Sequence, residues 1–236
     1  SAIGLPIALY LGYDAFEAIL EGAFEIDEHF KSAPFEQNIP LIMALLSVWN
    51  TSFLGYTAQA ILPYDQALHM LPAYLQQGEM ESNGKHVNFA GETVPYTTVP
   101  IIWGMTGING QHAFYQCLHQ GNVIVPADFI ASVKPQVNVD KHHDILLSNF
   151  FAQTEAMMSG VDAAQVTADL TAKGKSQAEI DELLNHKIHQ GNRPTTSMLL
   201  DTVDAKTVGR LIALYEHKIF CQGIILEICS FDQWGV

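Results

Sequence analysis

Short apolar segments without polar alternation recur along the chain, and longer segments with helical spacing of apolar residues separate them. Strands that are apolar on both sides are typical of a parallel sheet buried between helices. In a sheet with one solvent-exposed face, apolar and polar residues alternate along each strand. We therefore expect an α/β fold, with helices on both faces of a parallel sheet. The expected strands are residues 57–62, 99–103, 122–126, 194–200 and 224–229.

The segments between these strands carry start and stop signals of helices. Asn38 can cap the helix that follows it, and Ser176 opens an S-x-x-E capping box. Pro72 is expected to kink the helix that contains it. The region 158–190 contains no expected strand, so we predict a helical insertion or arm there. The expected helices are 14–31, 38–49, 66–77, 111–119, 140–158, 161–173, 176–186 and 205–221.

Charge and hydropathy limit the partners of the chain. The 25 acidic and 11 basic residues give a formal net charge of −14. A nucleic-acid binder needs a basic face, and so does docking on an anionic membrane, so we expect neither partner. The apolar run Ile39–Trp49 is too short to span a bilayer. Because 48% of the residues are hydrophobic and only 15% are charged, the chain has a large core or buries apolar surface against a partner.

Cysteine and histidine spacing predicts a compartment and argues against a metal site. The three cysteines form no C-x-x-C motif, which favours a reducing, cytoplasmic location. No basic region precedes the apolar start, so we expect no signal peptide there. The histidine pairs at 142–143 and at 186 and 189 lack a third ligand at a recognised spacing, and we therefore expect no metal. The chain ends inside the polar stretch 230–236, which we interpret as part of a longer protein.

The polar stretch 76–85 is the first candidate site. It combines two glutamates, three amides and a lysine at the expected end of a helix. One interpretation is a solvated helix end with Gly84 as its stop signal. The other is a carboxylate base held by neighbouring amides.

The glycine loop 107–112 is the second candidate. It lies between an expected strand and an expected helix, where exposed backbone N–H groups favour anions. The loop matches no established phosphate motif, so this signal is weak. His112 is expected in the first turn of the helix, where the positive end of the dipole favours a neutral imidazole. A capping or packing histidine is the alternative.

Eight strings are distributed over the chain: SAIGL at 1–5, LPYDQ at 62–66, QQGEMESNGK at 76–85, NGQHAFYQ at 109–116, LLSNFFAQTE at 146–155, GNRPTTS at 191–197, YEHKIF at 215–220 and SFDQWGV at 230–236. Together, and in this order, they resemble the phosphoglucose isomerase family. The resemblance implies a cofactor-free, metal-free dimeric enzyme that interconverts glucose 6-phosphate and fructose 6-phosphate. It also implies a three-layer sugar-isomerase fold.

The resemblance assigns roles to individual residues. Glu81 matches the catalytic base, which moves a proton between C1 and C2 through a cis-enediol. His112 matches the ring-opening histidine that one subunit donates to the other. Gln77 matches a substrate-binding glutamine, and Gln233 a glutamine of a binding loop.

The resemblance also divides the chain and identifies what it lacks. It implies linking helices from a missing N-terminal domain at 1–37, a second sugar-isomerase domain at 38–157 and 191–236, and an arm at 158–190. The family's arginine and phosphate loop lie upstream of Ser1 and its lysine beyond Val236, so the chain is expected to be an inactive C-terminal fragment.

The loop 103–112 departs from the family's W-G-E-P-G-T-N-G-Q-H string at Met105, Thr106 and Ile108. These changes leave a second hypothesis open, namely a non-catalytic sugar-phosphate-binding module. The low charge content leaves a third, a chain with an interaction role only. Retention of both Glu81 and His112 favours the enzyme, since a sensor needs neither.

Overall fold

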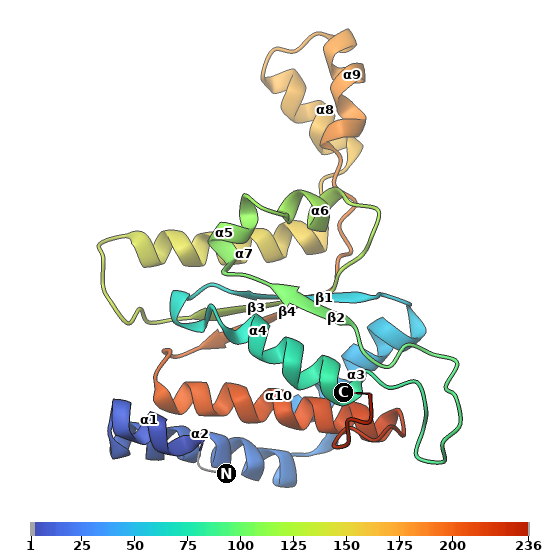
Figure 1. Ribbon diagram of the computed structural model, residues 1–236. Coiled ribbons are helices and arrows are strands. Elements are labelled where there is room, and N and C mark those ends of the chain that lie inside the picture. The colour runs from blue at the N-terminus through green and yellow to red at the C-terminus, as the bar shows by residue number, and fades with distance from the viewer. Residues whose placement is uncertain (1–2, 236) are drawn as a thin grey trace.

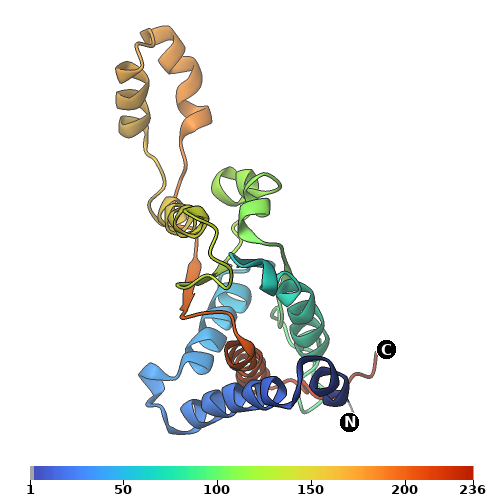
Figure 2. The same ribbon diagram turned by 90° about the vertical axis from the view of Figure 1, so that its left-hand side faces the viewer.

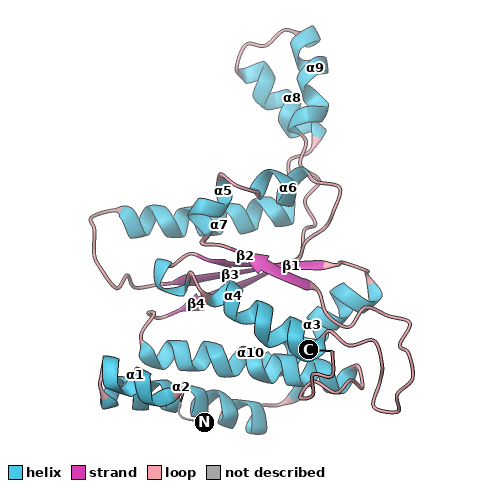
Figure 3. Cartoon of the chain, viewed as in Figure 1, coloured by secondary structure: helices cyan, strands magenta, loops and turns pink. Residues whose placement is uncertain are grey.

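The computed structural model describes residues 3–235, and a parallel sheet lies at the centre of this range. The sheet has four strands in the order β2-β1-β3-β4, with helices on both faces (Figures 1 and 3). The strands are β1 (Ala58–Pro63), β2 (Ile101–Gly104), β3 (Ala127–Ser132) and β4 (Thr195–Leu200). The predicted α/β fold with a doubly covered parallel sheet is confirmed.

Two layers of helices cover one face of the sheet (Figure 1). The helices next to the sheet are α3 (Ile39–Val48), α4 (Leu71–Leu75) and α10 (Ala205–Ile225). The helices beyond α10 are α1 (Gly4–Leu11) and α2 (Tyr13–Ser32). Helices α2 and α10 pack so closely that a Cβ at Gly22 or at Gly209 would overlap the backbone of the other helix.

Three helices cover the opposite face. They are α5 (Gly107–Gln111), α6 (Tyr115–Gln120) and α7 (His142–Ser159). The aromatic side chains of Tyr64, Phe129 and Phe150 lie in the core between these helices and the sheet. This core therefore belongs to a different face from the leucine-rich core that α4 and α10 bury.

Helices α8 (Ala163–Ala172) and α9 (Gln177–Lys187) project away from the sheet as a pair (Figures 1 and 2). The pair buries a small core of its own around Leu170 and Ile180. The predicted capping box at the start of α9 is confirmed. The Ser176 side chain accepts a hydrogen bond from the backbone N–H of Glu179, and the Glu179 carboxylate accepts one from the backbone N–H of Ser176. The division of the chain into domains stays a prediction.

The proline and asparagine signals have different outcomes. Asn38 caps α3 as predicted, because its side chain accepts a hydrogen bond from the backbone N–H of Leu41 at 3.4 Å. Pro72 does not kink a helix over 66–77. It lies in the first turn of α4, where the missing N–H has no partner to lose, after a separate 3₁₀ turn at Gln66–Leu68.

Two expected strands are wrong. The segment 122–126 is irregular, and β3 begins after it. The prediction missed β3 because the charged Asp128 interrupts the apolar pattern of this buried strand. The segment 224–229 is not a strand, since α10 continues to Ile225 and the chain then turns. Its β-branched residues imitate a strand, but Ile228 packs on Val48 outside the sheet.

Candidate active site

The turn Gln76–Glu81, which we call the π-turn, continues α4 as a π-helical segment. Two side chains attach it to the edge strand of the sheet. Gln76 Nε2 donates to the carbonyl oxygen of Ile102 at 3.1 Å, and the backbone N–H of Ile102 donates to Met80 Sδ at 3.4 Å. The π-turn therefore lies at the amino end of β2, whereas ligands of parallel sheets usually bind at the carboxyl ends.

The π-turn brings Gln77 and Glu81 together. Gln77 Nε2 lies 3.4 Å from Glu81 Oε2, as expected for side chains four residues apart, and both residues are exposed. Lys85 Nζ donates to the carbonyl oxygens of Glu81 at 2.8 Å and of Ser82 at 2.5 Å. The arrangement is compatible with the second interpretation of this stretch, a carboxylate beside an amide. It also contains part of the first, because the Lys85 ammonium caps the end of the turn.

The loop that contains Gln233 is tied to the segment just after Glu81. Ser230 Oγ donates to Asn83 Oδ1 at 2.6 Å, and Asn83 Nδ2 donates to the carbonyl oxygen of Ile219 at 3.0 Å. Gln233 is exposed, and its Nε2 donates to the carbonyl oxygen of Ser230 at 3.2 Å. The loop follows α10 and not a strand, contrary to expectation, and Val236 lies outside the described residues.

His112 lies after α5 and not in the first turn of a helix. Helix α5 covers Gly107–Gln111 and α6 starts only at Tyr115, so the predicted helix 111–119 is broken into two. His112 thus follows the C-terminal end of a short helix, and the dipole argument for a neutral imidazole is wrong. The side chain is exposed.

The neighbours of His112 hold the glycine loop on the aromatic core. Gln111 Nε2 donates to the hydroxyl of Tyr64 and to Asn149 Oδ1, both at 3.3 Å. A Cβ at Gly107 would overlap the ring of Tyr64, so the loop approaches the core this closely only because that residue is glycine.

Glu81 and His112 are not brought together within one chain. The π-turn packs with α4 and α10 on one face of the sheet, and α5 packs with α7 on the other (Figures 1 and 2). The side chains of Glu81 and His112 are nevertheless both exposed to solvent, and neither is buried in the core. The two candidate residues therefore belong to elements on opposite faces of the sheet.

Sequence reasoning missed a buried polar cluster behind the π-turn. Glu79 and Lys218 form an ion pair in which each side chain is 1% exposed. Asp128 accepts hydrogen bonds from Gln59 Nε2 at 3.0 Å and from the hydroxyl of Tyr215 at 2.9 Å. Burial raises the pKa of Asp128 to about 6, against the opposing effects of Lys218 and Tyr215. The available signal was a lysine on the apolar face of the helix 205–221.

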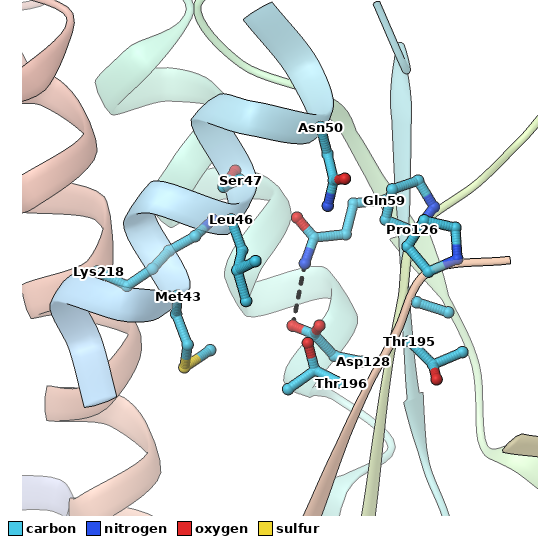
Figure 4. A pocket seen from close by; sticks show the side chains of 12 residues that line it. Met43, Leu46, Ser47, Asn50, Gln59, Pro126, Asp128, Thr195, Thr196 and Lys218 are labelled. Atoms are coloured by element: carbon cyan, nitrogen blue, oxygen red, sulfur yellow. Dashed lines mark hydrogen bonds between the residues drawn. The ribbon is translucent and has the colours of Figure 1, made fainter. Parts of the chain in front are cut away.

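A cavity of about 140 Å³ borders this cluster (Figure 4). Figure 4 shows Gln59 and Asp128 side by side, with Thr196 next to the carboxylate. The hydroxyl of Ser47 lines the cavity and is buried without a hydrogen-bond partner among the described residues. The cavity lies near the amino ends of β1, β3 and β4, beneath the sheet.

Residues 3–235 offer neither a metal centre nor a membrane-spanning helix. Within that range, no group of three or more His, Cys, Asp or Glu residues is arranged to hold a metal ion. In the same part of the chain, every helix is too short or too polar to cross a membrane.

A comparison with protein families decides the affiliation of the chain. The model of the family described as phosphoglucose isomerase matches residues 1–236. The chain belongs to the phosphoglucose isomerase family. The resemblance seen in the eight sequence strings is therefore confirmed.

Named relatives of the phosphoglucose isomerase family are longer than the chain. Glucose-6-phosphate isomerase of Pseudoalteromonas translucida is 93% identical over 236 residues, which are all of this chain and 43% of that protein. Glucose-6-phosphate isomerase 1 of Colwellia psychrerythraea is 63% identical over the same length and share. The chain thus spans less than half the length of the curated relatives that it matches.

Solved structures agree with the phosphoglucose isomerase fold. The crystal structure of a glucose-6-phosphate isomerase from Chlamydia trachomatis superposes with a TM-score of 0.86 at 36% identity, and the match covers 98% of this chain and 42% of that one. A hypothetical protein from Thermus thermophilus shares the fold, with a TM-score of 0.67 at 21% identity over 94% of this chain and 48% of that one.

Proposed function

We propose that the full-length protein is a cytoplasmic glucose-6-phosphate isomerase and that this chain supplies its catalytic base. The observation that carries the proposal is the open carboxylate of Glu81, which lies beside the amide of Gln77 on a turn attached to the sheet. One carboxylate suffices for this reaction, because a single proton is moved between adjacent carbons and no electrons are exchanged with a cofactor.

The proposed chemistry balances on the substrate alone. The Glu81 carboxylate removes the proton from C2 of the open-chain aldose, and the carbonyl oxygen at C1 gains a proton to give a cis-enediol. Glu81 then returns its proton to C1 while the hydroxyl at C2 loses one, which gives fructose 6-phosphate. Gln77 and Gln233, on the same side of the molecule, are proposed to contact the substrate and orient it.

His112 is proposed to act in the site of the other subunit of a homodimer. Opening the sugar ring needs an acid–base group near the ring oxygen, and an imidazole suits this task near neutral pH. The π-turn with Glu81 and the helix α5 before His112 pack on opposite faces of the sheet, which supports a site shared between two copies, each of which offers its His112 to the other. A twofold axis would then create two equal sites.

The rest of the full-length protein is proposed to complete the site and to cover apolar surface of this chain. Developing negative charge on the enediol needs a fixed cation, which we assign to residues outside residues 1–236. Helix α1 has no buried residue, and Leu9 and Tyr10 are 77% and 89% exposed. A missing N-terminal domain packed on α1 would account for this exposure. The chain alone is expected to be inactive.

Subunit mixing tests the base and the shared site together. In the full-length protein, Glu81→Gln should lower kcat by about 10²- to 10⁴-fold in an assay coupled to fructose 6-phosphate formation. A 1:1 mixture of Glu81→Gln and His112→Gln subunits should regain about a quarter of the wild-type activity, because half of the dimers are mixed and each has one intact site. Binding of glucose 6-phosphate with normal affinity but without turnover by the wild type would favour the sugar-phosphate-binding module instead.

No recovery in the mixture, with exchange of subunits verified by mass spectrometry, would contradict the shared site. A loss of less than about threefold in Glu81→Gln would remove the glutamate from the role of base.

A further inference from the structure

We propose that the buried ion pair Glu79–Lys218 is a positioning device for the Glu81 carboxylate, and that it sets the rate of the proton-transfer step. The inference rests on the proposed function. Both side chains are buried away from solvent, so they act through the π-turn and not on the substrate. What carries the inference is the position of Glu79, two residues before Glu81 on the same turn.

The ion pair links the π-turn to the long helix α10. Glu79 is the buried residue of the π-turn, and Lys218 lies on the apolar face of α10 between Tyr215 and Ile219. The pair therefore attaches the turn to α10 from within, while Gln76 attaches it to β2 from the side. A turn held at two points has little freedom to rotate.

The direction of Glu81 follows from that of Glu79. Successive residues of a helix are separated by about 100°, so side chains two positions apart point about 200° away from each other. In the wider π-helical turn this angle is smaller, but the two side chains still diverge. An inward Glu79 thus requires an outward Glu81, in agreement with the 1% exposure of Glu79 and the exposed side chain of Glu81.

The energetic cost of the pair argues against a role in stability alone. Taking two charges out of water costs several kcal/mol per ion, and apolar side chains of similar size often stabilise a fold as well or better. The neighbouring Asp128 adds a second acid to the cluster. An apolar contact would hold α10 and the π-turn together, but it would not fix the rotation of the turn as a directional hydrogen-bonded pair does.

A double variant separates positioning from stability. In the full-length enzyme, Glu79→Leu combined with Lys218→Met should keep the melting temperature at or above that of the wild type. We expect kcat/KM to fall by at least about tenfold, because small displacements of a reacting group cost one to two orders of magnitude. The isotope effect on kcat with glucose 6-phosphate deuterated at C2 should rise, since a displaced Glu81 makes proton transfer more rate-limiting. A stable double variant with wild-type kcat/KM and isotope effect would overturn the proposal.

Two single variants serve as a second test and its matched control. Glu79→Gln removes a buried charge on the π-turn and should also lower kcat/KM and raise the isotope effect. Asp128→Asn removes a buried charge from the same cluster, but Asp128 lies on β3, so kcat/KM should stay within about twofold. Equal losses in the two variants would overturn the inference, and so would a loss of fold in both Glu79 variants, since the pair would then serve folding only.

The Glu79 and Glu81 variants distinguish the positioning role from the proposed function. Full activity of the Glu79 variants beside an inactive Glu81→Gln would overturn the positioning role and leave the proposed function intact. An active Glu81→Gln would overturn both.

Discussion

Replacing Asp128 by asparagine should stabilise the protein at neutral pH, contrary to the usual result of changing a fully buried polar residue. Asp128 is 4% exposed, and burial raises its pKa from 3.8 to about 6. Lys218 and the hydroxyl of Tyr215 lower the pKa, while the nearby Glu79 raises it. Desolvation outweighs the favourable partners, so the charged form is the disfavoured one.

The sign and size of the effect follow from proton linkage. Between pH 3.8 and about 6 the folded state binds more protons at Asp128 than the unfolded state does. The free energy of unfolding therefore falls as the pH rises through this window, and the loss is complete above it. The rise of the Asp128 pKa from 3.8 to about 6 corresponds to about 3 kcal/mol.

Asparagine keeps an oxygen that can accept the bonds from Gln59 and Tyr215, but it does not titrate. We expect Asp128→Asn to match the wild type near pH 4 and to exceed it at pH 8. In a protein of the length of its curated relatives, of which this chain is 43%, about 3 kcal/mol corresponds to a melting temperature higher by about 3–6 °C, because the shift per kcal/mol falls as the protein grows. Scanning calorimetry of the full-length protein between pH 4 and pH 8 measures the difference. A variant that is less stable at pH 8, or that keeps the wild-type slope across the window, would refute the reasoning.

Two further substitutions probe the supports of the site and of the arm. Gly107→Ala would drive a Cβ into the ring of Tyr64, so thermal melting should show a free energy of unfolding lower by about 1–3 kcal/mol. The rate of ring opening, measured with the pure α-anomer of glucose 6-phosphate, should also fall, because the loop before His112 is displaced. Ser176→Ala removes the capping box of α9 and should cost about 1 kcal/mol locally. Hydrogen exchange should then rise in 177–187 while exchange in β1 and β3 stays unchanged, and a global rise would contradict a local cap.

Local signals predicted the parts of the fold that short segments determine by themselves. The cap at Asn38, the capping box at Ser176 and the strand at Ala58–Pro63 each depend on residues within a few positions. Strand β3 was misplaced because Asp128 interrupts its apolar run. The partner that makes this charge tolerable, Tyr215, lies 87 residues away, and no local pattern reports it.

Some features of the candidate site are likewise suggested by local sequence, and others are set by contacts between distant segments. The sequence suggested a carboxylate held by neighbouring amides in the stretch 76–85, but the helix expected over 66–77 stops short of Glu81. The π-turn, which was not expected, places Gln77 and Glu81 four residues apart on one helical segment. The tie between Asn83 and Ser230 joins segments 147 residues apart, and only the folded chain reveals it. The position of His112 was predicted wrongly, because the helix around it breaks where the glycine loop docks on Tyr64.

The π-turn explains why two identical side chains can differ in role. Glu79 and Glu81 have the same chemistry, and their sequence surroundings do not distinguish a base from a structural acid. The fold distinguishes them through Lys218, which neutralises one carboxylate in the interior while the other stays in solvent beside an amide. Exchanging the two environments would need only a rotation of the turn by half a revolution. The attachments to β2 and α10 oppose that rotation, so under the proposed function the orientation of Glu81 depends on contacts that its own side chain does not make.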